Sequence, residues 1–540
     1  MHRCVFTFKT TSRERQERRE SMAQQQASTI TDKWGVALAV LIAGGFMAIL
    51  DTSIVNIAIP KLESVFSVDT AQVQWVVTIY MLTLGVVVPL AGYLGERFGY
   101  RRIYILSLVV FTVGSALSGL SWSLSILTVF RVLQALGGGL IMPITMSMVY
   151  RMVPRESIGT AMGFWGLGII VAPAIGPTLG GWLVEYVDWR LIFYINVPIG
   201  ILGAFLALAY VPKFPSSNTG PFDMVGFVLS ATGLFGLLLA LSEGQTWGWN
   251  SEPIVLLLVA STLFLVLFTL WELTVEHPLL NLRVFAHGSF AMANLLVIII
   301  TVAMYSGVFY VPLFLQTVVG YGALKTGLMM MPAAAASAIM MPISGRLYDK
   351  IGARPLVLGG LLILTYTTFL LHRLSTTTPV SDVVLWLTLR GIGMGMAMMP
   401  ATTAGMSAVP TELVGTGSAI NNIMQRVAGS FGLAFMTAVL QSQATLHATT
   451  IAASYTPTSQ PAVQFMHQLT GFLVQHGMAL GQSVSLTTTE LYDLIQQQAF
   501  VMGIDDIFVL GAGITLLGAF LSLFLKTYRH QRASDQMIVD

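Results

Sequence analysis

The sequence contains one cysteine, Cys4, and only 10% of its 540 residues carry a charge. A single cysteine cannot form an intramolecular disulfide and offers no cysteine cluster to a metal ion. With 55% hydrophobic residues, so little charge excludes a soluble globular protein and gives no basic surface for nucleic acid. The first 32 residues are polar and arginine-rich, so they predict neither a signal peptide nor a spanning helix, and Met22 is an alternative start.

Enzyme and ATPase motifs are also missing. The glycine runs at 137–139 and 391–395 lie inside apolar segments instead of following a strand, so they indicate helix packing. Lys325 follows Leu324, where a phosphate-binding loop needs glycine, and no nucleophile–base pair or metal-ligand spacing is present. We therefore expect no enzymatic activity, no metal site and no cofactor, and any transport must draw on an ion gradient, with protons as the expected ion.

Long apolar segments dominate the chain instead. A helix needs about 20 apolar residues to cross a bilayer, and segments of this kind recur along the whole sequence. The predicted spans are 34–59, 71–93, 103–121, 124–149, 158–183, 191–211, 223–242, 254–272, 290–316, 326–345, 355–372, 382–409, 416–440 and 504–526. The sequence therefore predicts an all-α integral membrane protein with fourteen transmembrane helices, and the even number places both termini on one side.

The basic residues indicate which side that is. If the N-terminus is cytoplasmic, 20 Lys and Arg residues fall on inner segments and 4 on outer loops, while Arg131, Arg390 and Arg426 lie within spans. Cytoplasmic segments of membrane proteins carry an excess of Lys and Arg. The terminal segments 1–33 and 527–540 are therefore predicted to be cytoplasmic.

The longest loop, 441–503, has no Lys or Arg, which favours the outer side. Its semi-apolar run 465–480 is either a helix on or near the membrane or part of a polar loop.

The chain repeats two landmarks in the same order. The stretch Gly92–Gly99 (GYLGERFG) returns as Gly345–Gly352 (GRLYDKIG), and both follow a span. Arg131 and Arg390 each open a glycine-rich run that ends in Met-Pro. Duplicated bundles are typical of many secondary transporters. The predicted organisation is two six-helix halves, at 34–211 and 290–526, joined by a linker, 212–289, with two inserted spans.

An acid lies inside the first span, where a charge costs roughly 3 kcal/mol. Asp51 is about eight residues from the outer end of its span and Arg131 about seven from the outer end of the fourth, so both are roughly 10–12 Å below the surface. A carboxylate and a guanidinium at one depth are natural partners. The pair is either a proton relay or a permanent structural ion pair.

Three arginines and one acid follow the second span. They predict either a latch, in which Glu96 accepts hydrogen bonds from arginines or from a helix end across the cytoplasmic face, or an ordinary basic loop. The matched acid of the second copy, Asp349, favours the latch. The residues assigned to it are Gly92, Glu96, Arg97, Gly99, Arg101, Arg102 and Asp349.

The fifth span contains two prolines four residues apart among small residues. Proline removes a backbone donor and bends a helix, and small residues let another helix approach closely. We interpret the segment either as a seam between the two halves or as tight packing alone. Its residues are Pro173, Gly176, Pro177, Gly180 and Gly181.

A cavity for apolar ligands is typically lined by large side chains with few polar anchors. Arg426 is either part of such a cavity or an interfacial charge. The other candidates to face inward are Asn56, Gln74, Trp75, Met142, Trp165, Tyr305, Tyr310, Gln316, Asn421, Asn422, Gln425 and Arg390.

These motifs together resemble the major facilitator superfamily, in particular its fourteen-helix drug:proton antiporter branch of the EmrB/QacA type. Leu50–Pro60 is similar to the branch's first-span signature, and Gly92–Arg102 to the superfamily's cytoplasmic loop motif. Arg131–Gln134 resembles the fourth-span motif, Gly176–Gly181 the antiporter motif and Trp189–Gly200 the sixth-span signature. The departures are Glu96 where Asp is usual, Tyr100 where a basic residue is common, and Ala135 and Ala172 in place of glycine.

The resemblance implies export of amphipathic toxic compounds across the bacterial cytoplasmic membrane in exchange for protons, with Asp51 as proton carrier and Arg131 as its coupling partner. The span 326–345 lacks the acid that some quaternary-ammonium pumps carry there, which disfavours dicationic substrates. The long outer loop resembles members that hand substrate to a periplasmic adaptor protein. Two alternatives stay open: a dedicated exporter of one metabolite or antibiotic, and, from another class, a membrane scaffold or sensor without transport.

Overall fold

The computed structural model describes residues 34–214, 216, 220–375, 378–454 and 459–525. The predictions for 1–33 and 527–540, including Met22, lie outside these residues. In the described part every regular element is a helix, and 14 helices are long and apolar enough to cross a membrane. The predicted all-α membrane architecture is confirmed.

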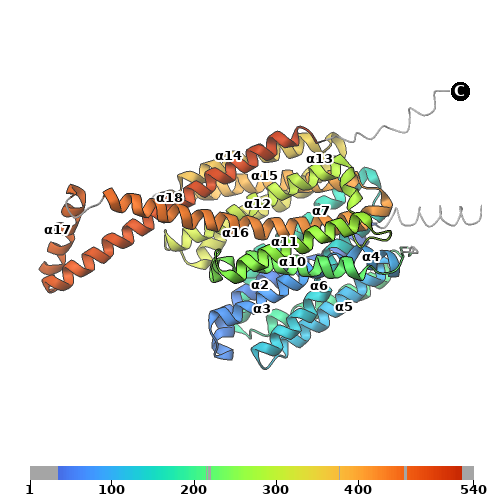
Figure 1. Ribbon diagram of the computed structural model, residues 1–540, viewed down its shortest axis with the longest axis horizontal. Coiled ribbons are helices and arrows are strands. Elements are labelled where there is room, and N and C mark those ends of the chain that lie inside the picture. The colour runs from blue at the N-terminus through green and yellow to red at the C-terminus, as the bar shows by residue number, and fades with distance from the viewer. Residues whose placement is uncertain (1–33, 215, 217–219, 376–377, 455–458, 526–540) are drawn as a thin grey trace, which may run out of the picture.

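The first six spans form one bundle, drawn in blue to cyan-green in Figure 1. Polar residues fix where its helices begin: the Asp69 carboxylate accepts from the backbone N–H of Gln72 at 2.8 Å, and Ser123 caps the fourth span in the same way. The elements are α2 (Trp34–Phe66), α3 (Thr70–Val87), α4 (Leu90–Phe98), α5 (Tyr100–Gly119), α6 (Leu124–Met152), η1 (Arg155–Ser157), α7 (Ile158–Tyr186), α8 (Leu191–Tyr194) and α9 (Asn196–Tyr210).

The C-terminal half repeats this bundle. Gly99 follows α4 and Gly352 follows its counterpart in the second half, with φ of 90° and 80°, a conformation that favours glycine. The repeated motif is therefore a repeated turn. The elements are η2 (Leu282–Ala286), α12 (Gly288–Thr317), α13 (Ala323–Ile351), α14 (Ala353–Leu370), η3 (Leu371–Arg373), α15 (Val380–Ser407), η4 (Thr411–Leu413), α16 (Val414–Ser454), α17 (Gln460–Gln475) and α18 (Leu480–Ser522).

Two inserted helices, α10 (Met224–Trp247) and α11 (Glu252–Thr274), lie between the bundles in Figure 1. Helix α10 packs against α3 of one half and α16 of the other, and its Leu238 and Leu239 form an apolar cluster with Leu82 of α3. Helix α11 leaves large apolar side chains exposed, as a helix in contact with lipid can.

Helices α16 and α18 continue far past the bilayer. Helix α18 has 43 residues, a length of roughly 65 Å against a hydrocarbon core of about 30 Å. With α17 they form an arm (441–454, 460–475 and 480–503) that projects at the left of Figure 1. At its base, His447 Nε2 lies 2.8 Å from Asp506 Oδ2, which ties α16 to α18.

The prediction of one long loop over 441–503 is therefore wrong. The helices extend through this segment because it loses hydropathy but keeps strong helix formers such as Ala, Leu and Gln, with no proline in 441–454 or 480–503. The run 465–480 overlaps α17, so the helical alternative for it is confirmed over most of its length.

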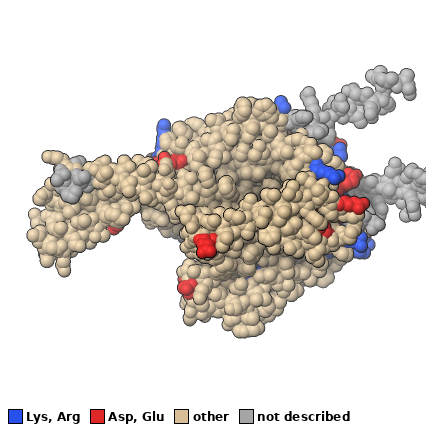
Figure 2. Space-filling view, viewed as in Figure 1, with Lys and Arg blue, Asp and Glu red and all other residues tan. Residues whose placement is uncertain are grey.

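Charged residues separate the two ends of the molecule. Figure 2 shows most of the visible Lys and Arg atoms at the end opposite the arm, where α4 and α13 end. We call this the basic end; the sequence predicts it to be cytoplasmic. The flank between the ends is largely without charge, as a lipid-facing surface requires.

The two halves meet near the basic end, along the first turns of α7 and the last turns of α13. Gly159 packs against the backbone of Gly345. One turn further along α7, a Cβ on Gly163 would lie 2.6 Å from the backbone oxygen of Met341. Backbones can approach this closely because Gly159 and Gly163 have no Cβ, so this pair of helices forms a seam between the halves.

The segment predicted as the seam, Pro173 to Gly181, lies elsewhere. Gly176 packs against Ser53, and a Cβ on Gly180 would lie 2.6 Å from Cγ1 of Ile54, so both glycines face α2 of their own half. The close approach was expected, but the partner helix was not. Small residues run along the whole of α7, and the sequence does not show which of them face which half.

We predict that Gly163→Ala opens the seam. The added methyl group meets backbone atoms of α13, and overpacking of this kind costs about 1–3 kcal/mol. The population with separated helices should rise roughly fivefold or more. Double electron–electron resonance between spin labels attached at positions 155 and 350, in a Cys4→Ser background, measures the distance between the start of α7 and the end of α13.

The control is Gly513→Ala in α18, where an added Cβ meets nothing within 4 Å. It should leave the distance distribution unchanged. An unchanged distribution in Gly163→Ala would contradict the assignment of the seam.

Candidate functional site

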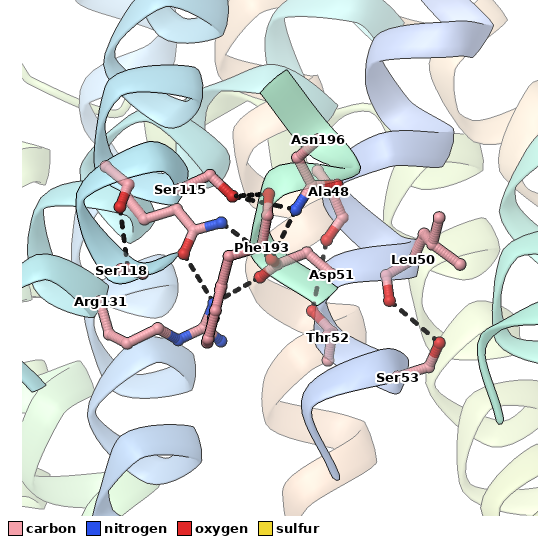
Figure 3. A network of polar contacts seen from close by, with 12 residues as sticks. Ala48, Leu50, Asp51, Thr52, Ser53, Ser115, Ser118, Arg131, Phe193 and Asn196 are labelled. Atoms are coloured by element: carbon pink, nitrogen blue, oxygen red, sulfur yellow. Dashed lines mark hydrogen bonds and ion pairs between the residues drawn. The ribbon is translucent and has the colours of Figure 1, made fainter. Parts of the chain in front are cut away.

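A buried polar network joins α2, α6 and α9 within the N-terminal half (Figure 3). The side chain of Asp51 points between Arg131 and Asn196. Its Oδ2 accepts from Arg131 Nη1 at 2.6 Å, and its Oδ1 accepts from Gln134 Nε2 at 2.8 Å and from Asn196 Nδ2 at 2.9 Å. Asp51, Arg131, Gln134 and Asn196 are all 0% exposed. The two residues that the sequence paired by depth are therefore in contact.

Each of these contacts donates a hydrogen bond to Asp51, which is the environment of an ionised carboxylate. Oδ1 accepts two hydrogen bonds and Oδ2 accepts one, so the position of the Asp51 carboxylate depends on donors from two other helices.

Arg131 is positioned by more than its acid. Its Nη1 also donates to Gln134 Oε1 at 2.7 Å, and its guanidinium stacks on the ring of Tyr80, 3.8 Å from the ring centre. Tyr80 is fully buried on α3. Stacking and planar hydrogen bonding both need a guanidinium, so lysine cannot reproduce this arrangement.

Sequence reasoning missed three polar members of the network. Gln134 lies one turn after Arg131 and therefore on the same face of α6. Asn196 is in the sixth-span signature but has no feature that separates it from a packing residue. Asn196 also donates to Ser115 Oγ at 3.1 Å, and Ser115 donates to the backbone oxygen of Phe193, which anchors α5 to the start of α9.

The second half contains the arginine without the acid. Arg390 is buried on α15, and it donates to the backbone oxygen of Ala303, to Ser306 Oγ at 3.3 Å and to Thr368 Oγ1 at 3.2 Å. Among the described residues no carboxylate pairs with it. Both halves therefore keep the buried arginine, and in the described residues only that of the first half is paired with a carboxylate.

Asp349 joins the two halves at the basic end. From the last turn of α13, its carboxylate accepts from the backbone N–H groups of Gly159 at 2.8 Å and Thr160 at 2.9 Å, and from the Thr160 hydroxyl at 2.7 Å. These groups open α7 of the other half, where unpaired N–H groups and the helix dipole attract an anion. The helix-end contact expected of the latch is therefore made by Asp349.

Glu96, the matched acid of the first copy, has a different partner. Its Oε1 lies 3.5 Å from Nη2 of Arg151, which also stacks on Tyr100 at 4.5 Å. Glu96 lies beside Gly415 in the first turn of α16. Burial raises the pKa of the Glu96 carboxyl above its ordinary value, and the neighbouring Arg151 opposes that rise. An ionised Glu96 is therefore less favoured here than in water.

The other latch residues take separate places. Gly92 packs against Gly415 across the halves, and Gly99 forms the turn described above. Arg101 donates to the backbone oxygen of Leu208, and Arg97 and Arg102 are exposed. None of these three arginines forms the ion pair of Glu96, which the structure gives to Arg151 on α6.

The predicted cavity residues do not form one group. Trp75 packs against the inserted helix α10, Tyr310 bonds to Thr437 inside the C-terminal half, and Trp165 donates to Thr145 Oγ1 at 3.4 Å. Asn56, Gln74 and Gln316 are exposed near the arm end, and Met142 is buried. The candidates near the interface of the halves are Tyr305, Asn421, Asn422, Gln425 and Arg426.

Two matched membrane bundles that pack against each other, with a buried ion pair in one of them, define a multi-pass membrane transporter. Comparison with known proteins gives its family. The sequence model of the Major Facilitator Superfamily matches residues 41–433, and the chain belongs to that superfamily.

Its relatives include named drug-resistance proteins. The chain is 36% identical to the MFS-type transporter YhcA of Bacillus subtilis, over 92% of this chain and 93% of that protein. It is 31% identical to the multidrug export protein EmrB of Haemophilus influenzae, over 86% of this chain and 91% of that protein. The lincomycin resistance protein LmrB of Listeria monocytogenes is 31% identical over 75% of this chain and 86% of its own length. The resemblance to the drug-transporting branch is confirmed.

Solved structures support the fold. The proton:xylose symporter XylE has a TM-score of 0.59 and 15% identity, covering 92% of this chain and 96% of that chain. The human organic anion transporter MFSD10 has a TM-score of 0.59 and 12% identity, covering 90% of this chain and 99% of that chain.

We predict that Asp349→Ala loosens the start of α7. The change removes the acceptor of two backbone N–H groups, and loss of a helix cap costs about 0.5–2 kcal/mol. Hydrogen exchange of the Gly159 and Thr160 amides should accelerate roughly tenfold. Asp493→Ala, which removes an exposed acid of the arm, serves as control. Equal protection of the Gly159 and Thr160 amides from hydrogen exchange in the two variants would contradict the latch.

A second prediction concerns the cation of the buried pair. Arg131→Lys keeps the charge but loses the stack on Tyr80 and the planar bridge between Asp51 and Gln134. We expect the protein to insert and fold, and its transport rate under a pH gradient to fall roughly tenfold or more. A transport rate under a pH gradient that is unchanged in Arg131→Lys would favour a purely structural ion pair.

Proposed function

We propose that this protein exports amphipathic small molecules across the bacterial cytoplasmic membrane in exchange for protons, by alternating access. The observation that carries the proposal is the buried carboxylate of Asp51, held by Arg131, Gln134 and Asn196 inside a span. An ionisable acid at membrane depth is expensive and is expected to serve function. The drug-resistance proteins among the relatives support the substrate class.

In the arrangement described here, the Asp51 carboxylate accepts three hydrogen bonds and the two halves are in contact at the basic end. A proton that binds Asp51 removes its charge, and Arg131 then loses its counter-ion. Keeping an unpaired guanidinium buried is unfavourable, so the network around α2, α6 and α9 must rearrange. Protonation is thereby converted into movement of helices.

Helix α7 gives this movement a route to the other half. Residues directly after Asp51, Ser53 and Ile54, contact Gly176 and Gly180 of α7. The first turns of the same helix form the seam with α13 and the contact with Asp349. The segment from Pro173 to Gly181 would thus link the proton site to the seam, which is the role we now assign to it.

The orientation of the protein follows from its charges. The excess of Lys and Arg supports a cytoplasmic basic end and, with it, cytoplasmic termini. The arm then lies outside, and it carries exposed apolar side chains such as Leu446, Phe472 and Val484 with no Lys or Arg. These side chains are suited to contact with a periplasmic adaptor protein. Protons are the energy source in this scheme, and the protein itself needs no cofactor.

We predict that Asp51→Asn abolishes proton-driven efflux and leaves the protein folded. The amide is nearly isosteric but cannot exchange a proton, so efflux of amphipathic dyes from vesicles with an imposed pH gradient should fall at least roughly tenfold. Asp493→Asn makes the same chemical change on the exposed arm and should transport normally. Efflux at the wild-type rate in Asp51→Asn would refute the proposal.

The substrate range is tested in cells. An efflux-deficient host that expresses the chain is exposed to a panel of toxic compounds, with and without a protonophore. Protonophore-sensitive resistance to several unrelated amphiphiles supports a multidrug exporter. Resistance to one compound indicates a dedicated exporter. Resistance to none of the compounds indicates a scaffold or sensor.

A further inference from the structure

One intramembrane arginine has no role in the proton network or the latch. Arg426 lies on α16, twelve residues after its first residue, Val414. At 1.5 Å per residue this is about 18 Å from the basic end and close to the centre of a core of about 30 Å. A cation at that depth is expensive, and its default interpretation is a functional site.

The surroundings of Arg426 place it between the halves. Its guanidinium interacts electrostatically with the hydroxyls of Tyr80, on α3 of the N-terminal half, and Tyr305, on α12 of the C-terminal half. The Tyr305 ring packs against Gly429, one turn further along α16. Arg426 itself is partly exposed.

Unlike the other two arginines of the spans, Arg426 has no acceptor in the described part of the chain. Arg131 bonds to Asp51 and Gln134, and Arg390 bonds to one carbonyl and two hydroxyl oxygens. The amides nearest to Arg426 along α16 are already engaged. Gln425 donates to Asn421 at 2.7 Å, and Asn421 donates to Asn294 at 3.3 Å.

The charge balance of this region is therefore positive. Asp51 is matched by Arg131, the described residues of the tenth span between 326 and 345 include no acid, and Arg426 adds one unpaired cation near two aromatic rings. A cationic ligand would be repelled here. An anion would gain charge-assisted hydrogen bonds to the guanidinium, and the hydroxyl of the partly exposed Tyr305 can donate to it as well.

We propose that Arg426 binds the anionic head group, typically a carboxylate, of an amphipathic substrate whose apolar body lies against Tyr305. This inference rests on the proposed function and names its substrate class: acidic amphiphiles rather than organic cations. The substrate is held from α16 while the proton is held from α2, and Tyr80 lies beside both arginines.

The test uses three probes with one apolar body and different head groups. These are 9-anthracenecarboxylate, its carboxamide and the 9-anthracenylmethyl trimethylammonium ion, titrated against the full chain in nanodiscs by fluorescence. Wild-type protein should bind the carboxylate roughly tenfold or more tightly than the carboxamide, and the ammonium ion least. Equal binding of the three probes, binding of none, or preference for the ammonium ion overturns the proposal.

Variants of Arg426 test whether this residue causes the preference for the carboxylate. Arg426→Gln should lower carboxylate affinity roughly tenfold and leave carboxamide affinity unchanged, whereas Arg426→Lys should keep most of the preference. Arg283→Gln makes the same change at an exposed position and should behave as wild type. If Arg426→Gln does not fold, the wild-type ranking and Arg426→Lys still decide. Full carboxylate preference in a folded Arg426→Gln contradicts the assignment.

Efflux separates this inference from the proposed function. Proton-driven efflux of the neutral carboxamide without any carboxylate preference leaves the proposed function standing and removes this inference. Carboxylate binding through Arg426 without proton-dependent efflux of any probe supports this inference and refutes the proposed function.

Discussion

The structure depends on one ion pair in a place that water does not reach. Asp51 and Arg131 are both fully buried, and either charge alone would be strongly unfavourable inside a span. The pair is tolerated because Gln134 and Asn196 complete the hydrogen bonding of the carboxylate. Three helices, α2, α6 and α9, are therefore held together by an interaction whose strength depends on the charge of one carboxyl group. A switch that responds to protons requires this property.

The rest of the fold connects that interaction to the contact between the halves. Helix α7 packs on α2 through Gly176 and Gly180, and on α13 through Gly159 and Gly163. Glycine at these positions lets the backbones approach closely, so a displacement of α2 is passed on by direct contact. The two halves differ in their buried arginines: the first pairs Arg131 with Asp51, whereas in the described part of the second half Arg390 bonds to a carbonyl and two hydroxyl oxygens instead of a carboxylate.

Much of this was predictable from the sequence, for physical reasons that can be named. The cost of charge in hydrocarbon singled out Asp51 and Arg131, and equal depth paired them. Hydropathy gave the fourteen spans, and the repeated glycine turn gave the duplication. Three features were out of reach. Helix facing cannot be read from a span that is apolar all round, so the seam was placed on the wrong part of α7. Hydropathy ends where the membrane ends, so the helical arm was taken for a loop. Gln134 and Asn196 are significant only through the carboxylate that they contact in space.

Infrared difference spectroscopy of the purified protein tests the central claim most directly, because a protonated carboxylic acid has its own carbonyl stretching band. The account predicts that acidification from neutral pH produces such a band, that one component of it is missing from Asp51→Asn, and that the labels at Arg155 and Lys350 move apart over the same pH range. A band that is identical in Asp51→Asn, or a protonation of Asp51 that leaves the distance between the labels unchanged, would contradict it.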